Sequence, residues 1–237
     1  MAFALLPTMS LEAKERELQQ HLQALVPNIV LRWQPVPGTE IAGFLLEEAS
    51  ASTPVPRESF SQVMDSPPFW SLLWPSGNLV CRFLAGNPEL VRGRTCVDLG
   101  CGSGLVAVTC ARAGAQVVAA DIDPLSTQAC RLNSLANDVN VRLTDFWHPD
   151  PCDTLILADF LYDDTNIPTL LEFRKVCQEI FVLDCRLEEL DIESFQYLGS
   201  CVGVAVPDLD PHGEFGRLRC WYYGPRVEEW SRILSEK

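Results

Sequence analysis

Positive charge is scarce in this sequence. The 237 residues contain 18 lysines and arginines against 32 aspartates and glutamates, which gives a formal net charge of −14. A chain this acidic is repelled by phosphate backbones at long range, so we do not expect a nucleic acid partner. A basic protein surface or a cationic side chain is the easier partner for it.

Long apolar runs and closely spaced metal ligands are also missing. No stretch approaches the roughly 20 apolar residues that a membrane-spanning helix needs, so no membrane association is expected. The first residues lack the basic start and apolar core of a signal peptide, and acidic residues begin at Glu12, which together predict a cytoplasmic protein. The ten cysteines form no CxxC pair and there are three histidines, so we expect no metal site and buried thiols instead.

From residue 70 onward the sequence alternates between strand-like and helix-like segments. The expected strands are 95–99, 116–120, 139–143, 154–158 and 180–183, with a closing antiparallel pair at 201–206 and 217–223. The expected helices are 77–84 (with Ser76 as cap), 105–113, 124–137 and 167–177. This order predicts an α/β fold, a Rossmann-like seven-stranded, mostly parallel sheet with helices on both faces.

The first part of the chain is less regular. Residues 1–66 are interpreted as a small N-terminal extension, and residues 67–237 as the main domain. Within the extension, Ser10 is a suitable N-cap for a helix over 10–25, and 30–33 could form a short strand. The segment 34–68 is rich in Pro, Ser, Thr and Glu, which predicts long loops around an apolar patch at 41–46.

A glycine-rich turn follows the strand at 95–99. Gly100, Gly102 and Gly104 alternate in a D-x-G-x-G-x-G pattern that begins at Asp98, and such a strand–turn–helix unit binds a ligand at the carboxyl edge of a sheet. The dinucleotide pattern G-x-G-x-x-G would require a glycine at Leu105. Alternate glycines let the backbone approach a ligand, and Asp98 could order the turn or meet a cationic group. The loop therefore favours S-adenosyl-L-methionine, which carries a sulfonium and an amino group and has no pyrophosphate.

A second acid, Asp121, comes directly after the strand at 116–120. Its carboxylate could accept hydrogen bonds from both ribose hydroxyls of a bound nucleoside, although an ordinary loop carboxylate would fit the position too. Asp123 is better explained as the N-cap of the next helix. Ile122, between the two acids, is assigned with Asp121 to the cofactor-binding set.

A third acid, Asp145, follows the next strand. It could accept the exocyclic amine of adenine, and Phe146 and Trp147 could wall the base. The alternative is a plain turn before His148 and Pro149.

Taken together, Asp98 to Gly104, Asp121 and Asp145 resemble the class I, seven-β-strand S-adenosylmethionine methyltransferases. The segments Pro67-Pro68-Phe69-Trp70, Leu73-Trp74-Pro75-Ser76-Gly77 and Ala158-Asp159-Phe160-Leu161-Tyr162-Asp163 narrow the resemblance. They are similar to the lysine methyltransferases of the electron transfer flavoprotein β-subunit and their bacterial homologues, within a nicotinamide N-methyltransferase-like set. The resemblance covers roughly residues 65–223. Ser76, where a glycine is expected, and Cys101 depart from the pattern.

The resemblance implies site residues as well. Trp74 would lie near the cofactor, although tryptophans near helix starts are often packing residues. Asp159 and Tyr162 follow the fourth strand at the same edge as the glycine loop, where the resemblance assigns them the catalytic role. Asp159 could orient the amine or hold the developing cation, and Tyr162 could wall the pocket or contact the cofactor. The alternatives are a strand end and a half-buried aromatic side chain.

The implied activity is N-methylation of a lysine side chain on a protein substrate. That substrate would be the electron transfer flavoprotein β-subunit or another basic protein surface, attracted by an acidic rim at Asp163 and Asp164. Two alternatives stay open from the sequence: a small-molecule N-methyltransferase acting on an amine or a nicotinamide-like ring, and a non-catalytic module that keeps the fold.

Overall fold

A seven-stranded sheet forms the centre of the protein, seen in a computed structural model that describes residues 10–50, 52–161, 163–208 and 216–235. Its strands lie in the order β5-β4-β3-β6-β7-β9-β8. Their bounds are β3 Thr95–Leu99, β4 Gln116–Ala120, β5 Val141–Thr144, β6 Cys152–Ala158, β7 Cys177–Asp184, β8 Gln196–Val202 and β9 Arg217–Tyr223. All neighbouring pairs from β5 to β7 are parallel, and β9 runs antiparallel to both of its neighbours. The predicted Rossmann-like, mostly parallel sheet is confirmed.

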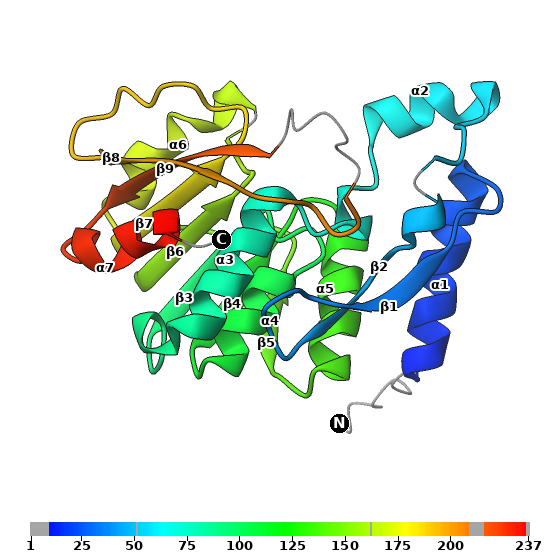
Figure 1. Cartoon of the computed structure of the whole chain (residues 1–237), viewed down its shortest axis with the longest axis horizontal. Helices are drawn as coiled ribbons and strands as arrows, with labels where there is room; N and C mark the ends of the chain where they lie inside the picture. Colours follow the sequence, from blue (N-terminus) through cyan, green and yellow to red (C-terminus); the bar gives the residue numbers. More distant parts are fainter. Residues whose placement is uncertain (1–9, 51, 162, 209–215, 236–237) are drawn as a thin grey trace, which may run out of the picture.

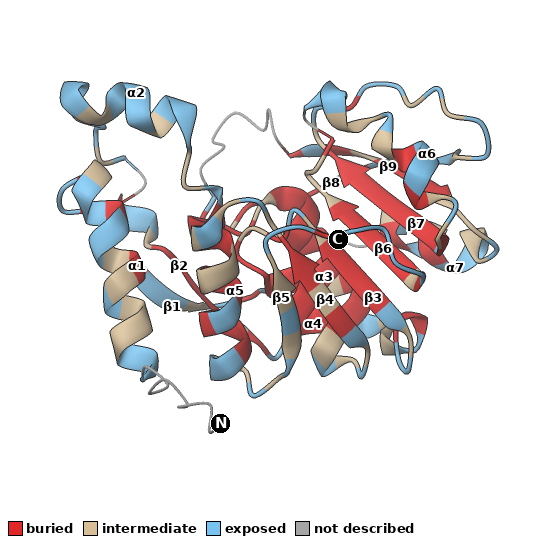
Figure 2. Ribbon diagram, turned by 180° about the vertical axis from the view of Figure 1, so that it is seen from behind, coloured by how far each residue is buried: buried red, intermediate tan, exposed pale blue. Residues whose placement is uncertain are grey.

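Helices α3 (Pro75–Gly86), α4 (Leu105–Arg112) and α5 (Pro124–Ala136) lie on one face of the sheet (Figure 1). The short helix α7 (Val227–Ser231) joins this layer, where Trp230 stacks on Phe181 of β7 with ring centroids 4.5 Å apart. The other face packs against α6 (Thr169–Phe173) and the loops around it. Figure 2 shows that the centre of the sheet is its most deeply buried part.

Several element boundaries differ from the sequence prediction, three of them in ways that have a clear structural reason. The helix predicted at 77–84 with Ser76 as its cap begins two residues earlier, because Pro75 occupies the first helical position and Trp74 is the N-cap. The helix predicted at 167–177 is reduced to α6, which starts only after Pro168. The strand predicted at 201–206 is β8, shifted toward the N-terminus; Val206 instead pairs with Leu73 outside the sheet.

The N-terminal extension consists of α1 (Leu11–Leu25), the strands β1 (Leu31–Pro35) and β2 (Ala42–Leu46), and α2 (Arg57–Asp65). The expected cap is present, since the Ser10 side chain accepts a hydrogen bond from the Ala13 amide. The apolar patch at 41–46 is β2, which pairs with β1 as an antiparallel hairpin. Helix α2, which buries none of its residues, was not predicted, because the segment around it is rich in Pro, Ser, Thr and Glu and was interpreted as loops.

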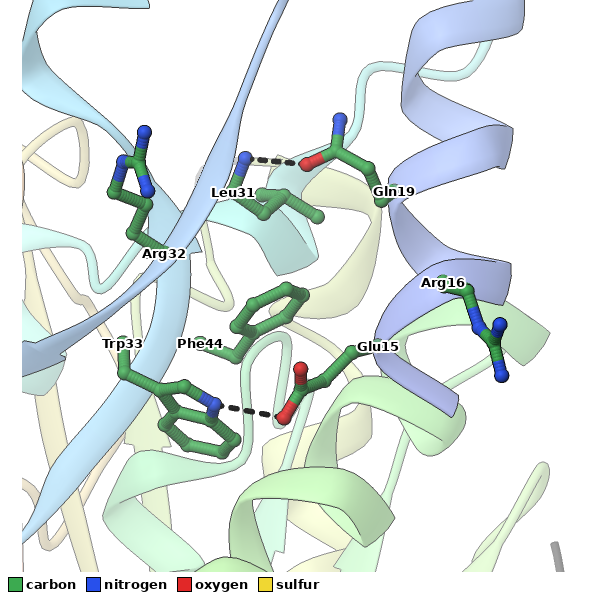
Figure 3. A pocket seen from close by; sticks show the side chains of 7 residues that line it. All are labelled: Glu15, Arg16, Gln19, Leu31, Arg32, Trp33 and Phe44. Carbon is green, nitrogen blue, oxygen red and sulfur yellow. Dashed lines mark hydrogen bonds between the residues drawn. The ribbon is translucent and has the colours of Figure 1, made fainter. Parts of the chain in front are cut away.

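Two sets of contacts hold the hairpin in place. Toward α1, the Trp33 indole donates to the Glu15 carboxylate at 2.8 Å and the Leu31 amide donates to Gln19 at 2.7 Å (Figure 3). Toward α5, the Phe44 amide donates to the side-chain oxygen of Asn133 at 2.8 Å. Asn137 similarly exchanges two hydrogen bonds with the backbone of Ala42. The extension is therefore fastened to the helix that follows the second strand of the main sheet.

The cysteines are placed as expected. None of the ten forms a disulfide, and all are buried except Cys185, which is half-buried. Burial raises the pKa of the Cys81 thiol to about 12, which keeps it in the neutral form.

Among the described residues, no helix combines the length and the apolar character needed to cross a bilayer.

Candidate active site

The glycine loop turns in the left-handed region of backbone conformation. Gly100, Gly102 and Gly104 have φ of +75°, +50° and +74°. Two of them also lack the space for a side chain: a Cβ at Gly104 would lie 2.2 Å from the sulfur of Cys130 in α5, and one at Gly100 would lie 2.8 Å from the ring of Phe160. These two glycines are needed for close packing as well as for the turn.

Gly102 differs from the other two glycines. The nearest atom to a Cβ built there is the carbonyl oxygen of Phe69, 3.9 Å away, so open space adjoins this residue. Its amide donates to the Asp121 carboxylate at 2.9 Å. The loop is therefore less tightly packed at Gly102 than at Gly100 and Gly104.

Asp98, near the end of β3, orders the glycine loop that follows it. Its carboxylate accepts the amide of Ala107 at 3.0 Å, so it caps the first turn of α4. The side chain is only 3% exposed, and this burial raises its pKa to about 7. Of the two roles considered for Asp98, the geometry supports ordering of the turn.

Asp121 lies beside the loop at the end of β4. One carboxylate oxygen accepts the Gly102 amide and the other accepts the Asp123 amide, each at 2.9 Å. Partial burial raises the pKa of Asp121, and no ion pair within the described residues involves Asp98 or Asp121. Asp121, which is less buried than Asp98, therefore has no cationic partner in the described part of the chain and suits a ligand that offers hydrogen-bond donors or positive charge. Asp123 caps α5, as expected.

The ends of β4 and β5 lie side by side, with Ala120 opposite Thr144. Two large apolar side chains are exposed just beyond them, Ile122 at 87% and Phe146 at 60%. Exposed apolar groups beside an acid are what an adenosine moiety would cover, and Asp145 is exposed at the same place.

Trp147 does not lie with Ile122 and Phe146 at the exposed ends of β4 and β5. It is 6% exposed and packs against Phe173 of α6 with ring centroids 5.3 Å apart. The suggestion that it walls the base is therefore wrong: the chain turns here, so Trp147 points into the core and Phe146 outward.

Trp74 lies close to the loop through Phe69. Its indole donates to the Phe69 carbonyl at 3.1 Å, and the two rings meet edge-on at 5.4 Å. That same carbonyl is the atom nearest to a Cβ built at Gly102. Phe69 was not singled out from the sequence, although it stands in the motif before α3.

Asp159 is the acid at the end of β6. Its φ is +54°, a left-handed conformation that aspartate and asparagine tolerate better than most residues. The Ser76 amide donates to one carboxylate oxygen at 3.1 Å, and the Ser76 hydroxyl donates to the other at 2.7 Å. Burial and the nearby charge of Asp184 raise the pKa of Asp159 to about 7, against the lowering effect of Ser76. Asp159 is thus a carboxylate held in one orientation.

The structure says less about the remaining predicted site residues, Tyr162 and the acids of the rim. Tyr162 lies outside the described residues, so its assigned role stays a prediction. Asp163 is exposed and caps the short turn at Asp164–Asn166, where hydrogen bonds from Thr165 lower its pKa. The acidic rim is therefore a solvated loop next to Asp159.

The strand order, the left-handed glycine loop and the acids at three strand ends are those of the class I S-adenosylmethionine methyltransferase fold. Comparison with known proteins agrees. A family model described as ribosomal protein L11 methyltransferase (PrmA) matches residues 86–161.

Curated relatives match parts of the chain. It is 34% identical over 118 residues to the electron transfer flavoprotein beta subunit lysine methyltransferase of Homo sapiens, covering 47% of this chain and 45% of that protein. It is 37% identical over 187 residues to the ribosomal protein L11 methyltransferase of Klebsiella pneumoniae subsp. pneumoniae. That match covers 77% of this chain and 59% of that protein. The chain thus spans about half the length of the relatives it matches. S-adenosylmethionine is the cofactor of this class, and the glycine loop, Asp121 and the exposed apolar side chains fit it.

We expect Asp121→Ala to weaken the binding of S-adenosylhomocysteine about 10- to 100-fold, because the two predicted hydrogen bonds from the ribose hydroxyls to the Asp121 carboxylate would be lost. Isothermal titration calorimetry measures this directly. The matched control is Asp123→Ala, which removes a neighbouring acid and a helix cap but no predicted ribose contact. Equal affinities for the Asp121 variant and the wild type would remove Asp121 from the cofactor site.

Proposed function

We propose that this protein transfers the methyl group of S-adenosylmethionine to the ε-amino group of a lysine in a protein substrate. The observation that carries the proposal is the Asp159 carboxylate, fixed at the carboxyl edge of the sheet beside the glycine loop. Phe160, the next residue, touches the loop at Gly100. An amine that reaches Asp159 is therefore brought to the edge where the cofactor is expected.

The chemistry requires a neutral amine. A lysine side chain at neutral pH is protonated and has no lone pair to attack a methyl carbon. Asp159 can pair with the incoming ammonium and hold it in one direction, and its raised pKa makes it a better proton acceptor than an ordinary aspartate. Removal of the amine from water lowers the amine's own pKa, which favours loss of the proton. When bound, S-adenosylmethionine supplies an activated methyl group on a sulfonium.

Two further observations favour a protein as the acceptor. The relatives are named for protein substrates, the electron transfer flavoprotein beta subunit and ribosomal protein L11. In addition, helix α2 stands clear of the main body (Figure 1) and exposes Phe60 at 56% and Met64 at 62%. These residues are four apart on one helix face, and an exposed apolar face of this kind suits a protein surface better than a small amine.

The test is a label-transfer experiment with the full chain and methyl-tritiated S-adenosylmethionine. The acceptors are purified electron transfer flavoprotein β-subunit, purified ribosomal protein L11 and nicotinamide, each in a separate reaction. We expect label in a protein band on a denaturing gel, recovered as methyl-lysine after hydrolysis. Label in nicotinamide alone would replace the proposal with small-molecule methylation. Cofactor binding with no transfer to a wide set of lysate proteins and small molecules would indicate a non-catalytic module.

A further inference from the structure

Ser76 is buried at the start of α3 and contacts Asp159 with both of its polar donors. It is the second residue of the helix, after Pro75, and its side chain is 0% exposed. The hydroxyl donates to one oxygen of the Asp159 carboxylate and the amide donates to the other. Each carboxylate oxygen is thus tied to a different donor of one residue, so the plane of the carboxylate is fixed as well as its position.

The contact also serves the helix. The first amides of a helix have no partner within it, and the N-cap residue Trp74 offers no side-chain hydrogen bond. Asp159, 83 residues further along the chain, supplies the missing acceptor at Ser76. A negative charge at this end of a helix is favourable, so helix and carboxylate stabilise each other.

Two more side chains lie around Asp159, and they affect its ionisation in opposite directions: Asp184 raises the pKa of Asp159, and a hydrogen bond from Cys185 lowers it. Asp184 ends β7 and Cys185 follows it, and both lie close enough to Asp159 that one atom of each of the three side chains falls within 4.8 Å of the others. The Asp184 charge disfavours a second charge on Asp159, and burial adds to that effect. Asp184 itself accepts the amides of Leu161 and Leu187, so it is held in its place.

We infer that Ser76 is a positioning residue, whose hydroxyl keeps Asp159 oriented and ionised so that it can receive the acceptor amine. This inference rests on the proposed function, because it gives Asp159 a part in amine methylation. Since Ser76 is fully buried, water has no direct route to replace the hydroxyl in a Ser76→Ala variant. The carboxylate would keep the Ser76 amide and lose the hydroxyl, the closer of the two Ser76 donors.

The first test does not depend on activity. Carbon-detected NMR titration of the full chain gives the pKa of Asp159, its carboxyl resonance being identified by its absence in Asp159→Asn. We expect Ser76→Ala to raise that pKa by about one unit, and Ser76→Thr, which keeps a hydroxyl, to restore most of the wild-type value. Ser134→Ala is the matched control, a buried helix serine whose hydroxyl bonds to the Cys130 carbonyl instead. An unchanged Asp159 pKa in Ser76→Ala would overturn the inference.

The second test uses methyl transfer. We expect the acid limb of the pH profile of kcat/KM to move upward in Ser76→Ala by the same amount as the NMR pKa, with unchanged affinity for S-adenosylhomocysteine. A lower rate with an unmoved limb would reduce Ser76 to a purely structural role and overturn the inference. If the wild type transfers no methyl group to any acceptor, the proposed function fails, and the NMR titration still decides whether Ser76 controls Asp159.

Discussion

Replacing Asp159 with asparagine is expected to lower methyl-transfer turnover by about 10²- to 10⁴-fold and to leave S-adenosylhomocysteine affinity within about threefold. Asparagine has the same shape, tolerates the left-handed backbone at this position and can still accept one hydrogen bond from Ser76. It carries no charge to hold an ammonium and does not accept a proton at neutral pH. The substitution should therefore lower turnover and leave the stability of the folded protein nearly unchanged.

The pH profile gives this prediction a second readout. Because the pKa of Asp159 is raised to about 7, the carboxylate form disappears as the pH falls through 7. Wild-type kcat/KM should rise with pH through this range and then level off, and the limb should vanish in Asp159→Asn. Asp164→Asn, which removes an exposed acid from the same loop, is the control and should behave like the wild type. Normal turnover by Asp159→Asn would refute the catalytic assignment.

Gly104→Ala should strongly destabilise the protein. The added Cβ would meet the sulfur of Cys130 at 2.2 Å and its Cα at 2.6 Å, and the backbone there has φ +74°. Overpacking and a left-handed alanine together cost about 3–5 kcal/mol, a large part of the stability of a domain this size. We expect the melting temperature to fall by about 10 °C or more.

Gly86→Ala is the matched control for this change. No atom lies within 4 Å of a Cβ built at Gly86, at the end of α3, so alanine should be neutral or slightly stabilising there. Thermal unfolding of the two variants beside the wild type separates packing at the loop from a general effect of glycine replacement. Equal melting temperatures for all three proteins would contradict the packing described for Gly104.

Local sequence signals were enough to predict the centre of the fold. The strands at 95–99 and 116–120 were predicted with their observed bounds, because each is a short apolar run bounded by polar residues and glycine. Asp123 and Ser10 were recognised as helix caps from their positions before apolar periodic segments. The glycine pattern also indicated the loop whose left-handed geometry is observed.

Contacts between distant segments could not be predicted in this way. Ser76 was interpreted as a helix cap, and nothing nearby in sequence points to its partner Asp159. The same holds for Glu179, which is fully buried and bound by Thr154, Tyr222 and Arg226. Each of these pairings depends on strand order, which a pattern of apolar residues does not specify.

Calorimetric titration of the full chain with S-adenosylhomocysteine and, separately, with NAD tests the assignment of the glycine loop most directly. We expect S-adenosylhomocysteine to bind at one site per chain, with its affinity reduced in Asp121→Ala and retained in Asp159→Asn, and NAD to give no binding. Binding of NAD in its place, or no binding of S-adenosylhomocysteine by the folded chain, would contradict the identification of this loop as a methyl-donor site.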